Sequence, residues 1–123
     1  MTIEDLLKKL DTAPADVTFE EVIRLIDENF TYTPTRFTNG KGKDMVVNEA
    51  GQNEGSCKIF AFADMFDFNE AATLALFGKY YREDVLGNLK GSDHANIRSF
   101  MRHGWDALEF EGQVLHDIEP AIK

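Results

Sequence analysis

The sequence is poor in cysteine and has no long apolar run. Its 123 residues contain one cysteine, Cys57, which excludes an internal disulfide and a zinc site built from several cysteines. No apolar stretch approaches the roughly 18 residues that a membrane-spanning helix needs. The first residues, 1–6, are acidic and amphipathic, unlike a signal peptide. We therefore expect a soluble protein that works in a reducing cytoplasm.

Clustered basic charge is also missing. The chain has 13 Lys and Arg against 22 Asp and Glu, which gives a formal net charge of −9. The acidic residues are spread along the whole chain, and no stripe of Lys and Arg stands out. Nucleic acids and anionic membranes both bind through grouped basic side chains. We expect neither as a partner, which leaves an unknown protein or small molecule.

Aromatic and aliphatic residues are plentiful. Ten Phe and a hydrophobic content of 43% are enough for one packed core. A chain of this length forms one domain rather than two, so residues 1–123 are expected to be a single unit.

Five segments have the apolar spacing of helices. Residues 3–11 and 19–29 each follow a threonine with an acidic residue three positions later, as in a capping box. A third helix is expected to start after Ser56 as N-cap, and a fourth to cover residues 70–82 after Asn69. The fifth is expected to start after Ser92 or Asp93 and to end at residue 103, before a glycine.

Two segments alternate between apolar and polar residues, as half-buried strands do. They are residues 30–35, where Pro34 indicates an edge strand or an early end, and residues 108–114. The apolar run 45–47 is a candidate to pair back as a hairpin. The prediction is an α+β fold, dominated by about five helices, with a small antiparallel hairpin or sheet.

Seven segments carry a family resemblance. They are Tyr32–Gly40, Val47–Asn53, Gly55–Ala63, Phe77–Leu86, Asp93–Arg98, Gly104–Trp105 and Phe110–Gly112. Through these segments the chain resembles the HopJ type III effector family of small bacterial proteins over about residues 19–115. The resemblance implies an effector-like role in some relatives, with delivery into host cells, and no established reaction. Because such effectors usually begin with a Ser-rich leader and this chain has only Ser56, Ser92 and Ser99, secretion rests on that analogy alone.

The polar loop 47–56 leads directly into Cys57. A helix start favours a thiolate through its free N–H groups and its dipole, and Lys58 adds positive charge. The string around Gly55-Ser56-Cys57, with Gln52 upstream, is similar to the nucleophile segment of papain-like proteases, although Lys58 replaces an aromatic residue there.

This pattern supports the hypothesis of a cysteine-dependent hydrolase or transferase. Its nucleophile is Cys57, its base is His94 or His103, and Gln52 or backbone amides hold the oxyanion. The alternative is that Cys57 is a small buried apolar residue and that Ser56 only caps the helix.

A second interpretation treats the same loop as a recognition surface. Asn48, Glu49, Gln52 and Asn53 form a dense polar set, which is either the rim of a binding site or a group that satisfies its own backbone. Ser56 belongs to this candidate binding set. We expect a binding or interaction module that combines residues 48–57 with His94 or Arg82, rather than an enzyme or a purely structural subunit.

Residues for other chemistries are sparse. Arg82 is a candidate partner contact, or an internal ion-pairing residue. His94, His103 and His116 lack the spacing of metal-ligand pairs, and no phosphate-binding or dinucleotide-binding motif is present. We therefore predict no metal and no cofactor.

Overall fold

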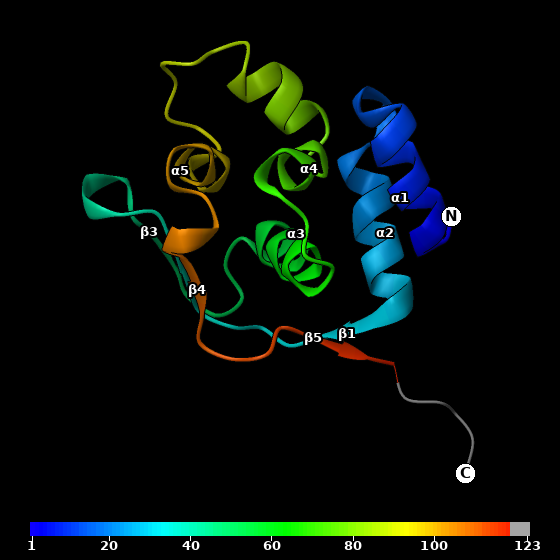
Figure 1. Ribbon diagram of the computed structural model, residues 1–123. Coiled ribbons are helices and arrows are strands. Elements are labelled where there is room, and N and C mark those ends of the chain that lie inside the picture. The colour runs from blue at the N-terminus through cyan, green and yellow to red at the C-terminus, as the bar shows by residue number, and fades with distance from the viewer. Residues whose placement is uncertain (119–123) are drawn as a thin grey trace.

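Helix α3 (Glu54–Met65) runs through the centre of the protein, and the other elements pack around it (Figure 1). The computed structural model describes residues 1–118. Helices α1 (Ile3–Thr12) and α2 (Phe19–Asn29) lie on one side of α3, and α2 packs against it. Helix α4 (Glu70–Ala75) contacts α3 and α5 (Ala95–His103), and α5 in turn contacts strands of one of the two small sheets.

The first two helices begin as their sequences predict. The Thr2 hydroxyl accepts a hydrogen bond from the Asp5 N–H, and the Asp5 carboxylate accepts one from the Thr2 N–H. Thr18 and Glu21 form the same reciprocal pair at the start of α2. Each capping box satisfies two N–H groups that the helix itself leaves without a partner.

Two small antiparallel sheets are present, and the apolar run 45–47 pairs back as a hairpin, as expected. Strand β1 (Phe30–Tyr32) pairs with β5 (Leu115–Asp117). Strand β2 (Phe37–Asn39) lies between β3 (Val46–Asn48) and β4 (Leu108–Phe110), so the apolar run 45–47 pairs with β2 and not with residues 30–35. The predicted strand 108–114 ends early, because residues 111–114 turn the chain from one sheet to the other.

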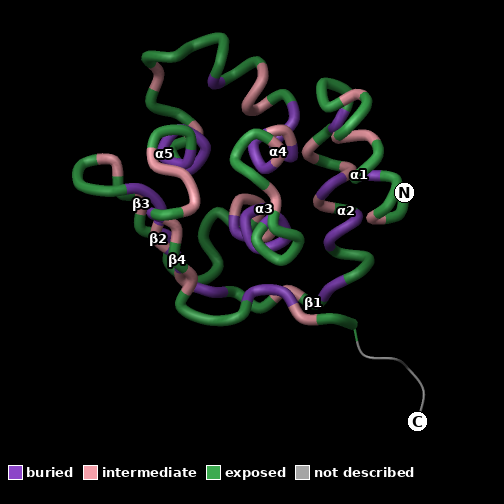
Figure 2. Tube along the Cα trace, in the orientation of Figure 1, coloured by how far each residue is buried: buried purple, intermediate pink, exposed green. Residues whose placement is uncertain are grey.

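The core is built around the ring of Phe60 on α3. This ring is fully buried and lies 4.9 Å from Phe100, 5.3 Å from Phe77 and 6.3 Å from Phe37, measured between ring centroids. These partners come from α5, from the turn after α4 and from β2, so the Phe60 side chain packs against three separate parts of the fold. In Figure 2 the buried residues gather on the faces of the helices that point toward α3.

The predicted helix over residues 70–82 is wrong in its second half. Helix α4 ends at Ala75, Gly78 has a φ of 61°, and the π-helix η3 (Tyr80–Val85) follows. The periodicity did not reveal this break, because apolar residues continue at helical spacing on both sides of it. Gly78 is required here because a Cβ at this position would lie 2.8 Å from the backbone nitrogen of Phe19.

Over residues 1–118 the architecture confirms the predicted fold class: an α+β domain with five α-helices and small antiparallel sheets. None of the helices within residues 1–118 combines the length and the apolar character needed to cross a membrane.

We expect Gly78→Ala to destabilise the protein more than Gly51→Ala does. Both glycines have positive φ, which costs an alanine about 1–2 kcal/mol. Only Gly78 also faces a backbone clash, whereas a Cβ at Gly51 would meet nothing within 4 Å. Overpacking of this kind adds about 1–3 kcal/mol. Urea denaturation of both variants measures the difference, and equal losses would contradict the tight contact at Gly78.

Candidate functional site

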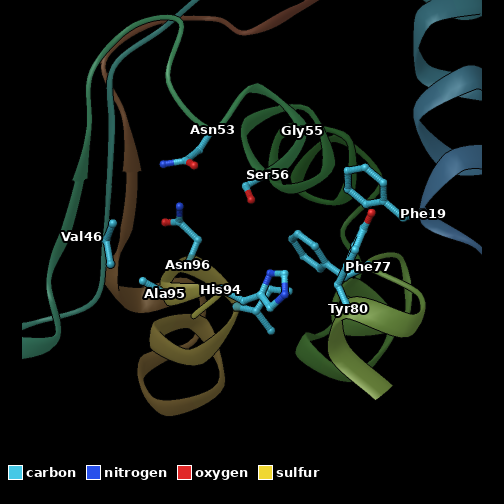
Figure 3. A pocket seen from close by; sticks show the side chains of 11 residues that line it. Phe19, Val46, Asn53, Gly55, Ser56, Phe77, Tyr80, His94, Ala95 and Asn96 are labelled. Carbon is cyan, nitrogen blue, oxygen red and sulfur yellow. The ribbon is translucent and has the colours of Figure 1, made fainter. Parts of the chain in front are cut away.

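Helices α3 and α5 begin at the same pocket, which has a volume of about 430 Å³. Figure 3 shows polar residues from both helix starts on one side and aromatic rings on the other. The lining residues are Phe19, Val46, Asn53, Gly55, Ser56, Phe77, Tyr80, His94, Ala95, Asn96 and Ile97. We call this the central pocket. Part of the 48–57 loop and His94 lie side by side in it. A recognition surface that combines the loop with His94 needs this proximity.

The N-cap residues of these helices differ from the prediction. Asn53 caps α3 with a φ of 50°, and His94 caps α5 with a φ of 52°. The predicted caps, Ser56 for α3 and Ser92 or Asp93 for α5, are wrong. Sequence rules look for a side chain that bonds the first turn, whereas neither Asn53 nor His94 makes such a bond.

Both helix starts therefore present free backbone N–H groups at the pocket. The first N–H groups of a helix have no partner within the helix, and no side-chain cap bonds them here. The first bond at each start runs from Cys57 N–H to the Asn53 carbonyl and from Arg98 N–H to the His94 carbonyl. The N–H groups of residues 54–56 and 95–97 remain available to a hydrogen-bond acceptor.

A buried network of asparagine side chains joins the two helix starts. Asn48 Nδ2 donates to Asn96 Oδ1 at 3.1 Å, and Asn96 Nδ2 donates back to Asn48 Oδ1 at 2.8 Å. Asn53 Nδ2 donates to the same Asn48 oxygen at 2.6 Å, and Asn39 Nδ2 donates to Asn96 Oδ1 at 3.1 Å. Asn48 and Asn39 are fully buried, whereas Asn53 is exposed. The network thus provides hydrogen-bond partners for polar side chains of the loop, and Asn53 still lines the pocket.

Aromatic rings form the opposite wall. The Tyr80 ring lies 5.1 Å from Phe19 in an edge-on arrangement and 5.4 Å from the imidazole of His94. His94 Nε2 lies 3.0 Å from Asp84 Oδ2. Tyr80 and Asp84 both belong to the π-helix η3, a conformation that is often found at functional sites.

Arg98 fixes the loop that carries His94. Its side chain is 5% exposed and donates to the carbonyls of Asn88 and Asp93 and to the Asp93 carboxylate. This guanidinium holds the pKa of the Asp93 carboxyl below its usual value. Because several bonds converge on one buried group, the turn before α5 has a defined shape.

Cys57 lies beneath the loop and not in the pocket. It is fully buried in the core, and its Sγ contacts the Thr35 carbonyl oxygen at 3.9 Å. Burial, with a smaller contribution from the charge of Glu54, raises the pKa of the thiol to about 11. Among the candidate bases, His94 bonds Asp84 and His103 bonds Asp44, each at 3.0 Å. This environment favours a neutral packed thiol over a reactive one.

The remaining predicted residues lie outside the central pocket. The Gln52 side chain accepts a bond from the Glu49 N–H, and the Glu49 carboxylate pairs with Arg36 at 3.4 Å. Arg82 donates to the carbonyls of Pro14 and Val17, so it holds the connection between α1 and α2. Within residues 1–118 no group of three or more His, Cys, Asp or Glu is arranged to hold a metal ion.

Several pocket residues were not in the predicted set. Phe19, Tyr80 and Asn96 come from three segments whose proximity no local pattern reveals, and Asp84 reaches His94 from the same π-helix as Tyr80. Asn96 left no distinct signal, because the buried part of α5 also contains the polar residues Arg98 and Ser99. A buried asparagine in such a position needs partners for its amide.

Comparison with known proteins gives a family and one close structure. The model of the HopJ type III effector protein family matches residues 3–115. A crystal structure described as that of the unknown function protein VPA0580 is 42% identical, with a TM-score of 0.90. The match covers 96% of this chain and 95% of the chain in that crystal structure. None of the curated proteins matches the chain.

We expect Cys57 to resist alkylation in the native protein. A thiol with a pKa of about 11 has little thiolate near neutral pH, and the buried sulfur is inaccessible. Iodoacetamide should label native Cys57 at least about 100-fold more slowly at pH 7.5 than in urea. Mass spectrometry follows the label, and rapid native labelling at that pH would restore the thiolate hypothesis.

We expect Asn48→Ala to lower the free energy of unfolding by about 1–3 kcal/mol. The substitution leaves the buried amide of Asn96 without its reciprocal partner. Asn88→Ala is the matched control, because Asn88 is exposed and surface changes usually stay within about 0.5 kcal/mol. Urea denaturation compares the two, and an equal effect would show that the asparagine network carries no stability.

Proposed function

The chain belongs to the HopJ type III effector protein family, and we propose that it is a binding protein whose ligand occupies the central pocket. The observation that carries this proposal is the convergence of two uncapped helix starts, an imidazole and aromatic rings on one cavity of about 430 Å³. Apolar walls with a few oriented polar groups are typical of small-molecule sites.

The aromatic wall accounts for the apolar part of the ligand. Tyr80 is half-buried and has Phe19 on one side and His94 on the other. A flat apolar or aromatic group of the ligand packs against these rings, and the free N–H groups of the helix starts bind its oxygen atoms. Both contacts are possible at once because the two sets lie on opposite sides of the pocket (Figure 3).

The charge around the pocket favours an uncharged ligand. Helix N-termini attract anions at short range, but the carboxylates of Asp84 and Asp93 lie within 4 Å of His94, and Glu54 begins α3. The whole chain has a net charge of −9, which repels an anion as it approaches. A neutral carbonyl compound gains the N–H bonds without this repulsion.

The supporting network favours a pocket that exists before the ligand arrives. Asn48 and Asn96 hold β3 and α5 together, and Asn53 joins α3 to the same pair. A site held in this way loses little conformational entropy on binding.

We expect Tyr80→Ala to weaken ligand binding about 10- to 100-fold, because an aromatic contact surface worth about 1.5–3 kcal/mol is lost. The probes are small aromatic amides and esters, with benzamide as the reference. Chemical-shift changes in ¹H–¹⁵N spectra of the full chain report binding at the amides of Gly55, Ser56 and Asn96.

Phe66→Ala is the control, because Phe66 is an exposed aromatic residue that does not line the central pocket. It should leave binding of the same probes unchanged. Probe-induced shifts that avoid both helix starts, or the absence of any binding across the library, would contradict the proposed function.

A further inference from the structure

Ser56 lines the central pocket, whereas its neighbour Cys57, which the sequence suggested as a nucleophile, does not. It belongs to the first turn of α3, and it lines the pocket while Cys57 points into the core. In Figure 3 the Ser56 hydroxyl points into the pocket, toward the imidazole of His94. The residue one position before the buried thiol is therefore the one that a ligand meets.

The contact between His94 and Asp84 leaves one imidazole nitrogen able to act as a base. Its Nε2 lies 3.0 Å from Asp84 Oδ2, and the carboxylate oxygen can only accept, so Nε2 carries the hydrogen. In the neutral ring this leaves the lone pair on Nδ1, the other nitrogen. The Tyr80 ring, tilted against the imidazole at 5.4 Å, and the loop fixed by Arg98 hold the imidazole in place.

The free N–H groups of the two helix starts supply what an acyl-transfer site needs beside a nucleophile and a base. A tetrahedral intermediate places negative charge on the former carbonyl oxygen, and fixed backbone N–H groups stabilise that charge. Such donors are present at residues 55–56 and at residues 95–97, on the same pocket as Ser56 and His94.

The geometry points to Ser56 as the nucleophile of an acyl-transfer reaction, with His94 as its general base and Asp84 as the residue that positions His94. This inference rests on the proposed binding function of the central pocket. It names the substrate class as small uncharged esters with an apolar or aromatic group, because the aromatic wall accepts that group and the surrounding carboxylates disfavour anions.

The reaction has two balanced halves. The Ser56 oxygen attacks the ester carbonyl carbon while its proton moves to Nδ1 of His94, and the alcohol leaves with that proton as its bond to the carbonyl carbon breaks. Water then attacks the acyl-Ser56 carbon and gives one proton to His94. That proton returns to the Ser56 oxygen when the carboxylic acid is released, as in other serine hydrolases.

A fluorophosphonate reagent tests the nucleophile in the full chain, because it phosphonylates activated serines. We expect mass spectrometry to find the adduct on Ser56 and not on Ser92, an exposed loop serine. Release of nitrophenolate from p-nitrophenyl butyrate should fall at least about 100-fold in Ser56→Ala, while Ser92→Ala keeps the wild-type rate.

Paired histidine variants test the base. His94→Gln should lose fluorophosphonate labelling about as strongly as Ser56→Ala, and His103→Gln should keep it, although both histidines bond an aspartate at 3.0 Å. Asp84→Asn should shift the pH dependence of nitrophenolate release, which a purely structural role would not do. The ¹H–¹⁵N spectrum of each variant confirms that it is folded.

The outcomes separate this inference from the binding function. If Ser56 of the folded wild-type chain takes no label, or if His94→Gln labels at the wild-type rate, the inference is overturned. Benzamide binding to Ser56→Ala tests the pocket independently: binding without labelling leaves a binding protein, and the absence of both refutes the two proposals together.

Discussion

The reciprocal hydrogen bonds between the Asn48 and Asn96 side chains are the interaction on which the site depends. One partner ends β3 and the other lies in the first turn of α5, 48 positions later. Asn53 and Asn39 attach α3 and β2 to the same pair. In this reciprocal pair each carboxamide donates one N–H and accepts at its oxygen, so the pair restricts the distance and the relative rotation of the elements that it joins.

This network also explains the unusual helix starts. An asparagine at an N-cap normally bonds the first turn of its own helix, but the Asn53 side chain bonds Asn48 instead. The His94 side chain likewise bonds Asp84 across the pocket. Each helix therefore loses its local cap so that the cap side chain can serve a tertiary contact, and the exposed N–H groups are the result. The two helices lack the stabilisation of a side-chain cap at the point where ligand contact is proposed.

Local patterns predicted the elements that are stabilised locally. The capping boxes at Thr2 and Thr18 and the stripes of α1 and α2 depend on residues within one or two turns, and the structure contains them. The break at Gly78 depends on the approach of the Phe19 backbone, and the pairing of β4 and β5 with different strands depends on the turn between them. The loop was expected to lie near His94 or Arg82; Asn53, Gly55 and Ser56 line one pocket with His94, and Arg82 does not line it. Tyr80, Asp84 and Asn96 join them only through tertiary packing, which no spacing along the chain records.

The π-helix has a consequence for how the site varies among relatives. A π turn holds more residues than an α turn, so deletion of a single residue within 80–85 restores α-helical geometry. Each residue of an α-helix turns the following side chains by about 100°, and such a deletion would rotate Asp84 relative to Tyr80. The core around Phe60 would be untouched, while the imidazole of His94 would lose its carboxylate. A relative with such a deletion would therefore keep the fold and lose the His–Asp pair.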